Sequence, residues 1–160
     1  MPQLPRPVRT GFALFALVLA LAGLFSLPAP AEALFGLFSD VKTLSPKDDA
    51  VTIPLAEVSD GKAHFYTVSA GGKEIRFFAV KSPDGKVRTA FDACDVCFPE
   101  KKGYRQEGEF MVCVNCGRRF HASKIGEIHG GCNPAPLAAE TTGESLRVAV
   151  AALAAGGRFF

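Results

Sequence analysis

The sequence predicts a small, mostly β domain, built as an antiparallel sandwich with two cysteine-bearing loops at one tip. Short segments rich in β-branched and aromatic residues recur after residue 50, and glycine- or proline-containing turns separate them. No long segment after residue 33 carries apolar residues at the helical period of about 3.6 residues. Two CxxC motifs come directly after or at the end of expected strands, which places their cysteines at strand ends.

The composition fits one folded domain and excludes two classes of protein. Of the 160 residues, 48% are hydrophobic and 21% are charged, a balance that a disordered chain does not have. The 18 Lys and Arg residues face 16 Asp and Glu residues, which gives a formal net charge of +2. This charge is too small for a dedicated nucleic-acid-binding protein, and no run of five basic residues occurs.

Residues 1–33 have the three-part layout of a secretory signal peptide. Arg6 and Arg9 form its positive end, residues 11–27 are an uncharged apolar run, and Ala31-Glu32-Ala33 is a small-x-small cleavage site. An uncleaved N-terminal membrane anchor is the alternative, in which residues 11–27 contact the membrane. In both cases we expect the rest of the chain to be exported, either periplasmic or anchored to the outer face of the inner membrane.

Residues 34–50 predict a linker, because much of the stretch is polar and Ser45-Pro46 interrupts it. The metal-binding β domain is then expected over residues 51–160. Its first three strands are predicted over residues 63–69, 74–81 and 86–91, and the tight turns between them favour an antiparallel meander.

The alternation within each strand predicts which side chains share a face. In the middle strand of the meander, Ile75, Phe77 and Ala79 lie on one face, and Arg76 and Phe78 lie on the other. Further strands are expected over residues 109–114 and 145–150, and one helical turn over residues 149–155.

Four cysteines predict a metal centre. Cys94 and Cys97 form one CxxC pair, and Cys113 and Cys116 form the second pair after 15 intervening residues. Two residues between thiolates let the chain turn so that both sulfurs face one point, and two such pairs supply a tetrahedral set that suits zinc or iron.

Three more residues are candidates near this centre. Cys132, in a Gly-Gly-Cys-Asn-Pro loop, is a fifth ligand, an alternate ligand or a free thiol. His121 and His129 lie between Cys116 and Cys132, and each is a candidate to support a ligand by hydrogen bonding. The simpler interpretation of each histidine is an exposed loop residue. Asp92 and Asp95 flank the first pair and are candidate carboxylate ligands for iron, although solvated acids are the simpler interpretation.

The chain resembles the family described as membrane iron–sulfur containing, FtrD-like. The stretches that carry the resemblance span residues 58–65, 91–97, 103–104, 113–117, 125–127 and 130–137. The resemblance implies an exported or membrane-attached protein that binds a metal centre through these cysteines. It also implies a role beside bacterial iron-uptake and membrane permease components.

The loop layout is also similar to that of Rieske domains, in which two ligand loops lie at the tip of a small antiparallel sandwich. Cys97 and Cys116 stand where a Rieske domain has histidines. A rubredoxin-like or zinc-ribbon-like domain has a comparable pair of CxxC loops. Thiolates in place of imidazoles are expected to lower the potential of a [2Fe–2S] cluster toward that of all-cysteine ferredoxins.

Three functions remain open from the sequence. The first is electron transfer through an iron–sulfur cluster or a mononuclear iron site, although the missing twin-Arg signal argues against a cluster loaded before export. The second is a closed zinc site with four cysteine ligands, or a copper-capturing module, without a redox role. The third is a thiol–disulfide redox protein.

The sequence favours a non-enzymatic electron-transfer or metal-binding protein, since no hydrolase or nucleotide-binding motif occurs. A membrane permease or a redox partner of an iron-uptake system is the expected partner. Basic residues near the cysteines could form a docking rim for an acidic partner: Lys101, Lys102, Arg105, Arg118, Arg119 and Lys124.

Overall fold

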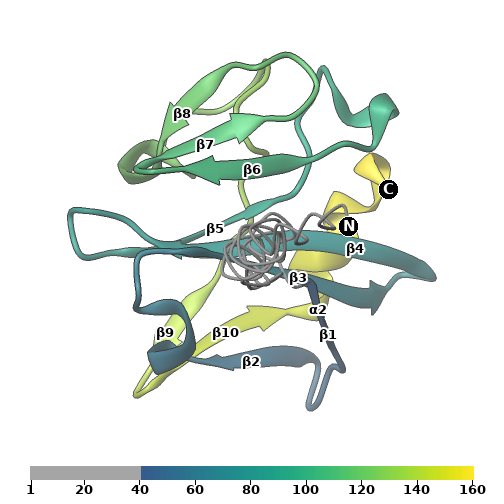
Figure 1. The fold of residues 1–160 in the computed structure, drawn as a ribbon. Helices are drawn as coiled ribbons and strands as arrows, with labels where there is room; N and C mark the ends of the chain where they lie inside the picture. Colours follow the sequence, from purple (N-terminus) through teal and green to yellow (C-terminus); the bar gives the residue numbers. More distant parts are fainter. Residues whose placement is uncertain (1–40) are drawn as a thin grey trace, which may run out of the picture. The chain divides into compact units, whose positions relative to one another are not determined.

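The computed structural model describes residues 41–160, and this part of the chain forms three β-sheets (Figure 1). The predicted signal peptide or anchor over residues 1–33 lies outside the described residues. The strands are β1 (Val41–Leu44), β2 (Ala50–Pro54), β3 (Ala63–Ala70), β4 (Lys73–Lys81), β5 (Val87–Phe91), β6 (Tyr104–Glu107), β7 (Phe110–Cys113), β8 (Arg119–His121), β9 (Glu140–Thr142) and β10 (Ser145–Ala149). Helix α2 covers Val150–Ala155, and short 3-10 helices cover Leu55–Val58, Phe98–Glu100, Ala122–Lys124 and Gly156–Phe159.

The three sheets are arranged as layers. The central sheet has the order β1-β3-β4-β5, the second sheet has the order β2-β10-β9, and the third sheet has the order β6-β7-β8. Figure 1 shows the central sheet between the other two. The fold is mostly β with antiparallel sheets, as predicted, and the parallel pair β1–β3 and the third small sheet extend the expected sandwich.

The predicted meander is confirmed as strands β3, β4 and β5. All pairs in it are antiparallel, with Phe65 opposite Phe78 and Phe77 opposite Phe91. The turn between β3 and β4 is made by Gly71 and Gly72, which both have the positive φ that favours glycine. The strand expected over residues 145–150 and the helical turn after it are also present, as β10 and α2.

The linker predicted over residues 34–50 differs from the structure in its described part. Val41–Leu44 forms strand β1, which pairs in parallel with β3, and β2 begins at Ala50. The Lys42 ammonium also lies 2.8 Å from a Glu57 carboxylate oxygen. Strand β1 is exposed along most of its length, so its sequence has no apolar alternation, and pairing with β3 determines its structure.

Strand β4 separates two cores by the alternation of its side chains. Ile75, Phe77 and Ala79 face the sandwich core, which lies between the central sheet, the second sheet and α2. Phe78 and Val80 face the other way, into a core shared with the third sheet. We call this second core the sulfur core; its buried members are Phe65, Phe78, Val80, Ala90, Cys94, Tyr104, Met111, Cys113, Ala122, Ile125 and Cys132.

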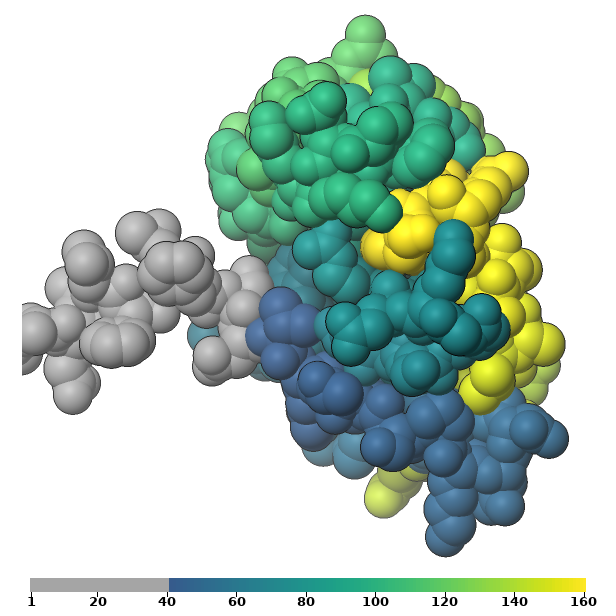
Figure 2. Space-filling view, turned by 90° about the vertical axis from the view of Figure 1, so that its right-hand side faces the viewer, coloured from purple at the N-terminus to yellow at the C-terminus, as the bar shows by residue number. Residues whose placement is uncertain are grey.

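The C-terminal segment packs beside the first cysteine loop. In Figure 2 this segment (yellow) lies along the central and upper layers of the domain. The ring of Phe159 lies 5.9 Å from the ring of Phe91 and 5.8 Å from that of Phe98, centroid to centroid. A side chain at Gly156 would clash with the ring of Phe91, so this close approach requires glycine. The aromatic cluster thereby fixes the chain on both sides of the Cys94–Cys97 loop.

Candidate metal centre

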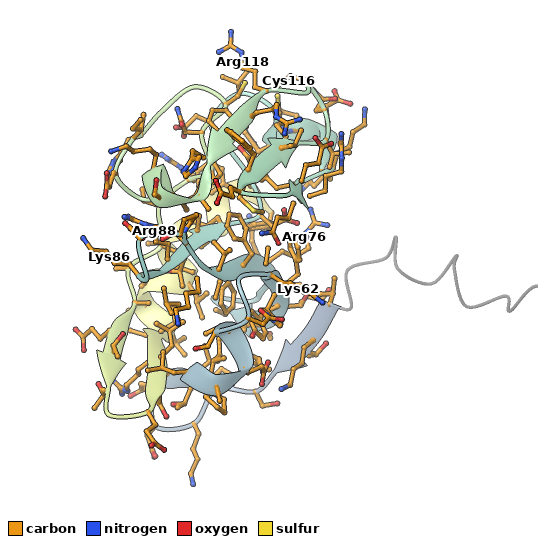
Figure 3. All side chains as sticks on the ribbon, turned by 60° about the vertical axis from the view of Figure 1, so that its left-hand side comes forward. Lys62, Arg76, Lys86, Arg88, Cys116 and Arg118 are labelled. Carbon is orange, nitrogen blue, oxygen red and sulfur yellow. The ribbon has the colours of Figure 1, made fainter. Side chains whose placement is uncertain are left out.

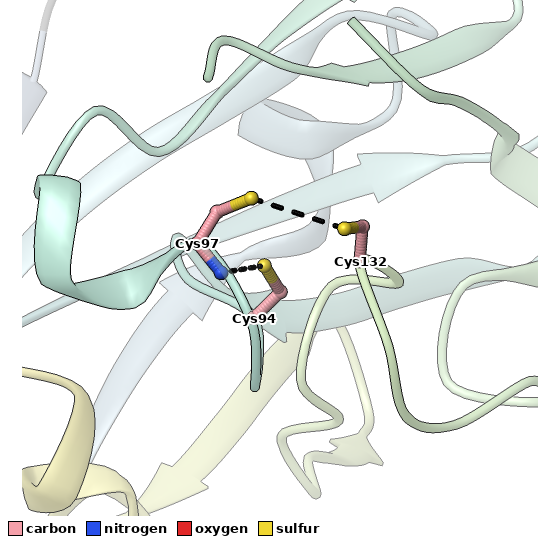
Figure 4. A group of neighbouring side chains, drawn as sticks. All are labelled: Cys94, Cys97 and Cys132. Carbon is pink, nitrogen blue, oxygen red and sulfur yellow. Dashed lines mark hydrogen bonds between the residues drawn. The ribbon is translucent and has the colours of Figure 1, made fainter. Parts of the chain in front are cut away.

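The first cysteine loop turns sharply after β5. The backbone N–H of Cys97 donates to Sγ of Cys94 at 3.1 Å (Figure 4). A short 3-10 helix, Phe98–Glu100, follows and ends at Lys101, which has a φ of 55°. This N–H···S contact fixes the sulfur of Cys94 on the inner side of the turn.

The second cysteine loop is a tight turn between β7 and β8. The backbone N–H of Cys113 donates to the carbonyl of Arg118, and that of Gly117 donates to the carbonyl of Cys113, both at 2.9 Å. Gly117 has a φ of +72°, which a glycine adopts without strain. The backbone N–H of Val114 donates to the carbonyl of Gly103, so this loop is also tied to the segment before β6.

The third loop carries Cys132 and is held beside the first. The N–H of Ala135 donates to the carbonyl of Ala93 at 2.9 Å, and the N–H of Phe91 donates to the carbonyl of Ala135 at 2.8 Å. The hydroxyl of Tyr104 donates to the carbonyl of Cys132 at 2.6 Å. These bonds bring Cys132 to the first pair, although it follows Cys97 by 35 residues.

The five sulfur atoms form two triads that share Cys97. Within the first triad, Cys94, Cys97 and Cys132, the Sγ atoms lie within 4.8 Å of one another, and those of Cys97 and Cys132 are 3.8 Å apart. Figure 4 shows these three side chains turned toward one another. The second triad consists of Cys97, Cys113 and Cys116. All four cysteines of the predicted CxxC set are therefore in the cluster, and Cys132 joins them.

The thiols differ in exposure and acidity. Cys94, Cys113 and Cys132 are buried, whereas Cys116 is exposed. Burial raises the pKa of Cys113 to about 11 and that of Cys132 to about 12. The backbone N–H of Arg118 lowers the pKa of Cys116 to about 7. Of the thiols of Cys113, Cys116 and Cys132, the exposed one at Cys116 therefore ionises most readily.

A buried carboxyl group lies beside the sulfur atoms. Asp92 accepts a hydrogen bond from the backbone N–H of Tyr104 at 2.7 Å, and the Arg76 guanidinium lies 3.8 Å away. Burial raises the pKa of Asp92 to about 6. A Cβ atom at Gly103 would clash with both carboxylate oxygens of Asp92, so the segment before β6 requires glycine here.

His121, His129 and Asp95 contact other groups than the sulfur atoms. The ring nitrogens of His121 contact Ser123 and Glu109, and Nε2 of His129 contacts the carbonyl of Gly126. Among the described residues, neither histidine joins a group that could hold a metal ion. Asp95 pairs with Arg158 at 3.0 Å. His129 is exposed in a loop and Asp95 is an exposed acid, as the simpler interpretation of these residues predicts. That interpretation is wrong for His121, which ends strand β8 and is half-buried, and for Asp92, which is only 8% exposed.

The donor set fits a thiophilic metal. All five described cysteines are free thiols, and thiolates select zinc, copper(I) and iron–sulfur clusters. A small hollow of about 10 Å³ is lined in part by Cys94, Cys97 and Cys113. That volume is close to the space of one water-sized sphere.

A family model described as membrane iron-sulfur containing protein FtrD-like matches residues 58–160. The chain belongs to this family. The matched region contains all five cysteines of the cluster, and the family description names both an iron–sulfur content and a membrane association. No curated protein and no solved structure gives a significant match to the chain. Within residues 41–160, no helix is long and apolar enough to span a membrane.

Cys132 and Asp92 are candidates in the sequence, but two features of their surroundings cannot be predicted from it. The role of Cys132 stays open there, because nothing in its own loop shows that residues 91–93 pair with it. The close approach of Gly103 to the carboxylate of Asp92 cannot be predicted either, because the two residues lie in different loops. The Gly-Gly-Cys-Asn-Pro stretch is the available signal for the first: it indicates a tight loop built around one thiol.

Proposed function

We propose that this FtrD-like domain is an exported iron–sulfur protein that transfers electrons in bacterial iron uptake. The observation that carries the proposal is the convergence of five thiols from three loops on one partly buried cluster. The family description supports iron–sulfur chemistry and a membrane location. An iron–sulfur cluster bound there would supply a one-electron redox couple.

The chain contributes a preorganised and largely dry set of donors. Phe78 and Tyr104 pack in the same core as the buried cysteines, with ring centroids 6.2 Å apart, and exclude water from the inner side. A backbone N–H group donates to Sγ of Cys94, and the backbone N–H of Arg118 lowers the pKa of Cys116. Such fixed dipoles reduce the reorganisation that accompanies a change of charge.

The predicted export accounts for the location of the function. Residues 11–27 would either direct secretion or hold the domain at the outer face of the inner membrane. A domain placed there meets iron before the ion crosses the membrane. An iron-uptake permease, or a redox protein that serves it, is the partner that this location favours.

The exposed end of the centre offers a docking face for that partner. Val96 is 61% exposed and Val114 is 40% exposed, and each lies inside a CxxC motif. Nζ of Lys102 lies 3.0 Å from Oδ1 of Asn115, and Figure 3 shows Arg118 next to Cys116 at the edge of the domain. An apolar centre with basic groups around it suits an acidic redox partner.

The test is metal analysis of the native protein. The full chain is expressed with its export segment, purified without oxygen in mild detergent, and assayed for iron, zinc, copper and acid-labile sulfide. We expect iron and sulfide in comparable amounts and an electron paramagnetic resonance signal after reduction. Zinc without iron would contradict electron transfer and leave a closed zinc-binding module.

Two cysteine–serine exchanges, one inside the cluster and one outside it, complete this assay. Cys113→Ser removes a buried sulfur while keeping nearly the same volume, and we expect it to lose the iron and the signal. Ser123→Cys adds a thiol outside the cluster and should change neither. A metal-free wild-type protein with interconverting thiols and disulfides would instead support a thiol–disulfide function.

A further inference from the structure

We infer that this centre holds two metal ions and that the thiolate of Cys97 bridges them. The inference rests on the proposed function only in requiring that the cysteines bind metal. It adds the number of ions, which ion is more exposed to solvent, and which two of the other four cysteines bind each ion. Thiophilic divalent ions are the class that this donor set takes.

The spacing of the sulfur atoms carries the inference. A tetrahedral ion with metal–sulfur bonds of about 2.3 Å holds its sulfurs roughly 3.8 Å apart. Cys97 and Cys132 already have an Sγ–Sγ distance of 3.8 Å, and each triad keeps all of its sulfurs within 4.8 Å. The triads meet at one atom, Sγ of Cys97, so two ions seated in the two triads share that ligand.

Charge balance favours two ions over one. Five thiolates with two divalent ions carry a formal charge of roughly −1, whereas four thiolates with one divalent ion carry roughly −2. A single ion would also leave the fifth thiol without a ligand role, although two loops of the chain are bonded together to bring it in. The two-ion site therefore has the smaller net charge in a partly buried position and uses all five sulfurs.

The two ions differ in their access to solvent. The inner ion has Cys94 and Cys132, both buried, together with half-buried Cys97. The outer ion has Cys116, which is exposed, and Cys113, which is buried. A chelator in solution therefore reaches the outer ion first, and a metal-donating or electron-donating partner would meet the same side.

The experiment is a cobalt(II) titration of the full chain, stripped of metal and kept reduced without oxygen. Thiolate-to-cobalt absorption bands report binding. We expect two equivalents per chain, released by excess chelator in a fast phase and a slow phase. Cys116→Ser should leave one equivalent and only the slow phase, and Cys132→Ser one equivalent and only the fast phase. Cys97→Ser should weaken both sites by at least tenfold.

The controls separate this inference from the proposed function. His129→Ala removes an imidazole outside the cluster, so this variant should still bind two equivalents of cobalt. Circular dichroism checks that each variant is folded. A single equivalent in the wild-type protein, or two equivalents in either Cys116→Ser or Cys132→Ser, would overturn the two-ion site while leaving a metal centre. A wild-type chain that binds no cobalt would overturn both.

Discussion

The sandwich core and the sulfur core share strand β4 but are stabilised in different ways. The sandwich core lies under the long strands β3 and β4 and consists of aliphatic and aromatic side chains. The sulfur core has three cysteines among its buried members, and β6, β7 and β8 on its outer side have only three or four residues each. The first core is built from long strands that bury apolar surface, whereas the second is built from short strands and from loops that bring thiols together.

Adjacent residues on β4 provide the largest test of this difference. Phe77 faces the sandwich core and Phe78 faces the sulfur core, and both are 0% exposed. We expect Phe77→Ala to lower the free energy of unfolding by about 3–5 kcal/mol with or without metal. Phe78→Ala should have a comparable effect in the metal-free protein and should also weaken metal binding.

Urea unfolding of metal-free and metal-loaded protein measures both effects. If metal binding stabilises the sulfur core, the metal-induced gain in stability will be smaller in Phe78→Ala than in Phe77→Ala. Equal metal-induced gains in the two variants would show that metal binding does not depend on the packing of the sulfur core. The comparison between the two cores would then fail.

The pKa of Asp92 predicts a pH effect at a buried carboxyl group next to the first cysteine loop. Its carboxyl pKa is raised from 3.8 to about 6 by burial, so the folded state holds a proton that the unfolded state has lost between these values. Stability is therefore expected to fall as the pH rises from about 4 to about 6 and to level off above that range. The full difference is about 3 kcal/mol at roughly 1.36 kcal/mol per pH unit.

Asp92→Asn isolates this contribution. The asparagine amide can still accept from the backbone N–H of Tyr104 but does not ionise. Metal-free wild-type and variant proteins are unfolded in urea at several pH values, and the difference between them is compared. We expect the variant to gain relative stability as the pH rises toward neutrality. A difference independent of pH would mean that Asp92 is ionised throughout the range.

Gly103 predicts a smaller effect at the same carboxyl group. An alanine there would place its Cβ against the Asp92 oxygens, at a φ of +66°. Gly61→Ala is the matched control, because it has a φ of +79° and open space around it. We expect Gly103→Ala to lower the free energy of unfolding in urea by about 2 kcal/mol, and Gly61→Ala to lower it by about 1 kcal/mol. Equal losses would show that the carboxyl group moves away freely.

The same division explains how much the sequence can predict. Alternation in residues 74–81 correctly predicts β4, because the side chains on each face of this strand pack in a different core. The prediction of a linker is wrong for strand β1, since its exposed residues carry no pattern and only pairing with β3 orders it. The CxxC spacing predicts four of the clustered thiols. Cys132 joins them through backbone bonds between distant loops, which no local pattern records.

The smallest effect is expected at the surface of the sulfur core. Nζ of Lys102 contacts Asn115 and lies 4.0 Å from a carboxylate oxygen of Glu100, whereas Arg118 has no ion pair within residues 41–160. Lys102→Glu and Arg118→Glu should change stability by less than about 0.5 kcal/mol, since both side chains are exposed. If this face docks an acidic partner, each reversal should slow electron transfer from an acidic ferredoxin at low salt, by roughly tenfold.

Lys86→Glu serves as the control for these reversals, because Lys86 is also exposed and lies well away from Cys116 in Figure 3. It carries the same change in net charge, so it separates a local docking effect from a general one. Transfer rates are measured by stopped flow over a range of ionic strength, with metal content checked in each variant. A docking face predicts that the reversals near Cys116 flatten the salt dependence and that Lys86→Glu does not. Equal slowing in all three variants would show that net charge alone governs the encounter, and the face around Val96 and Val114 would then have no special role.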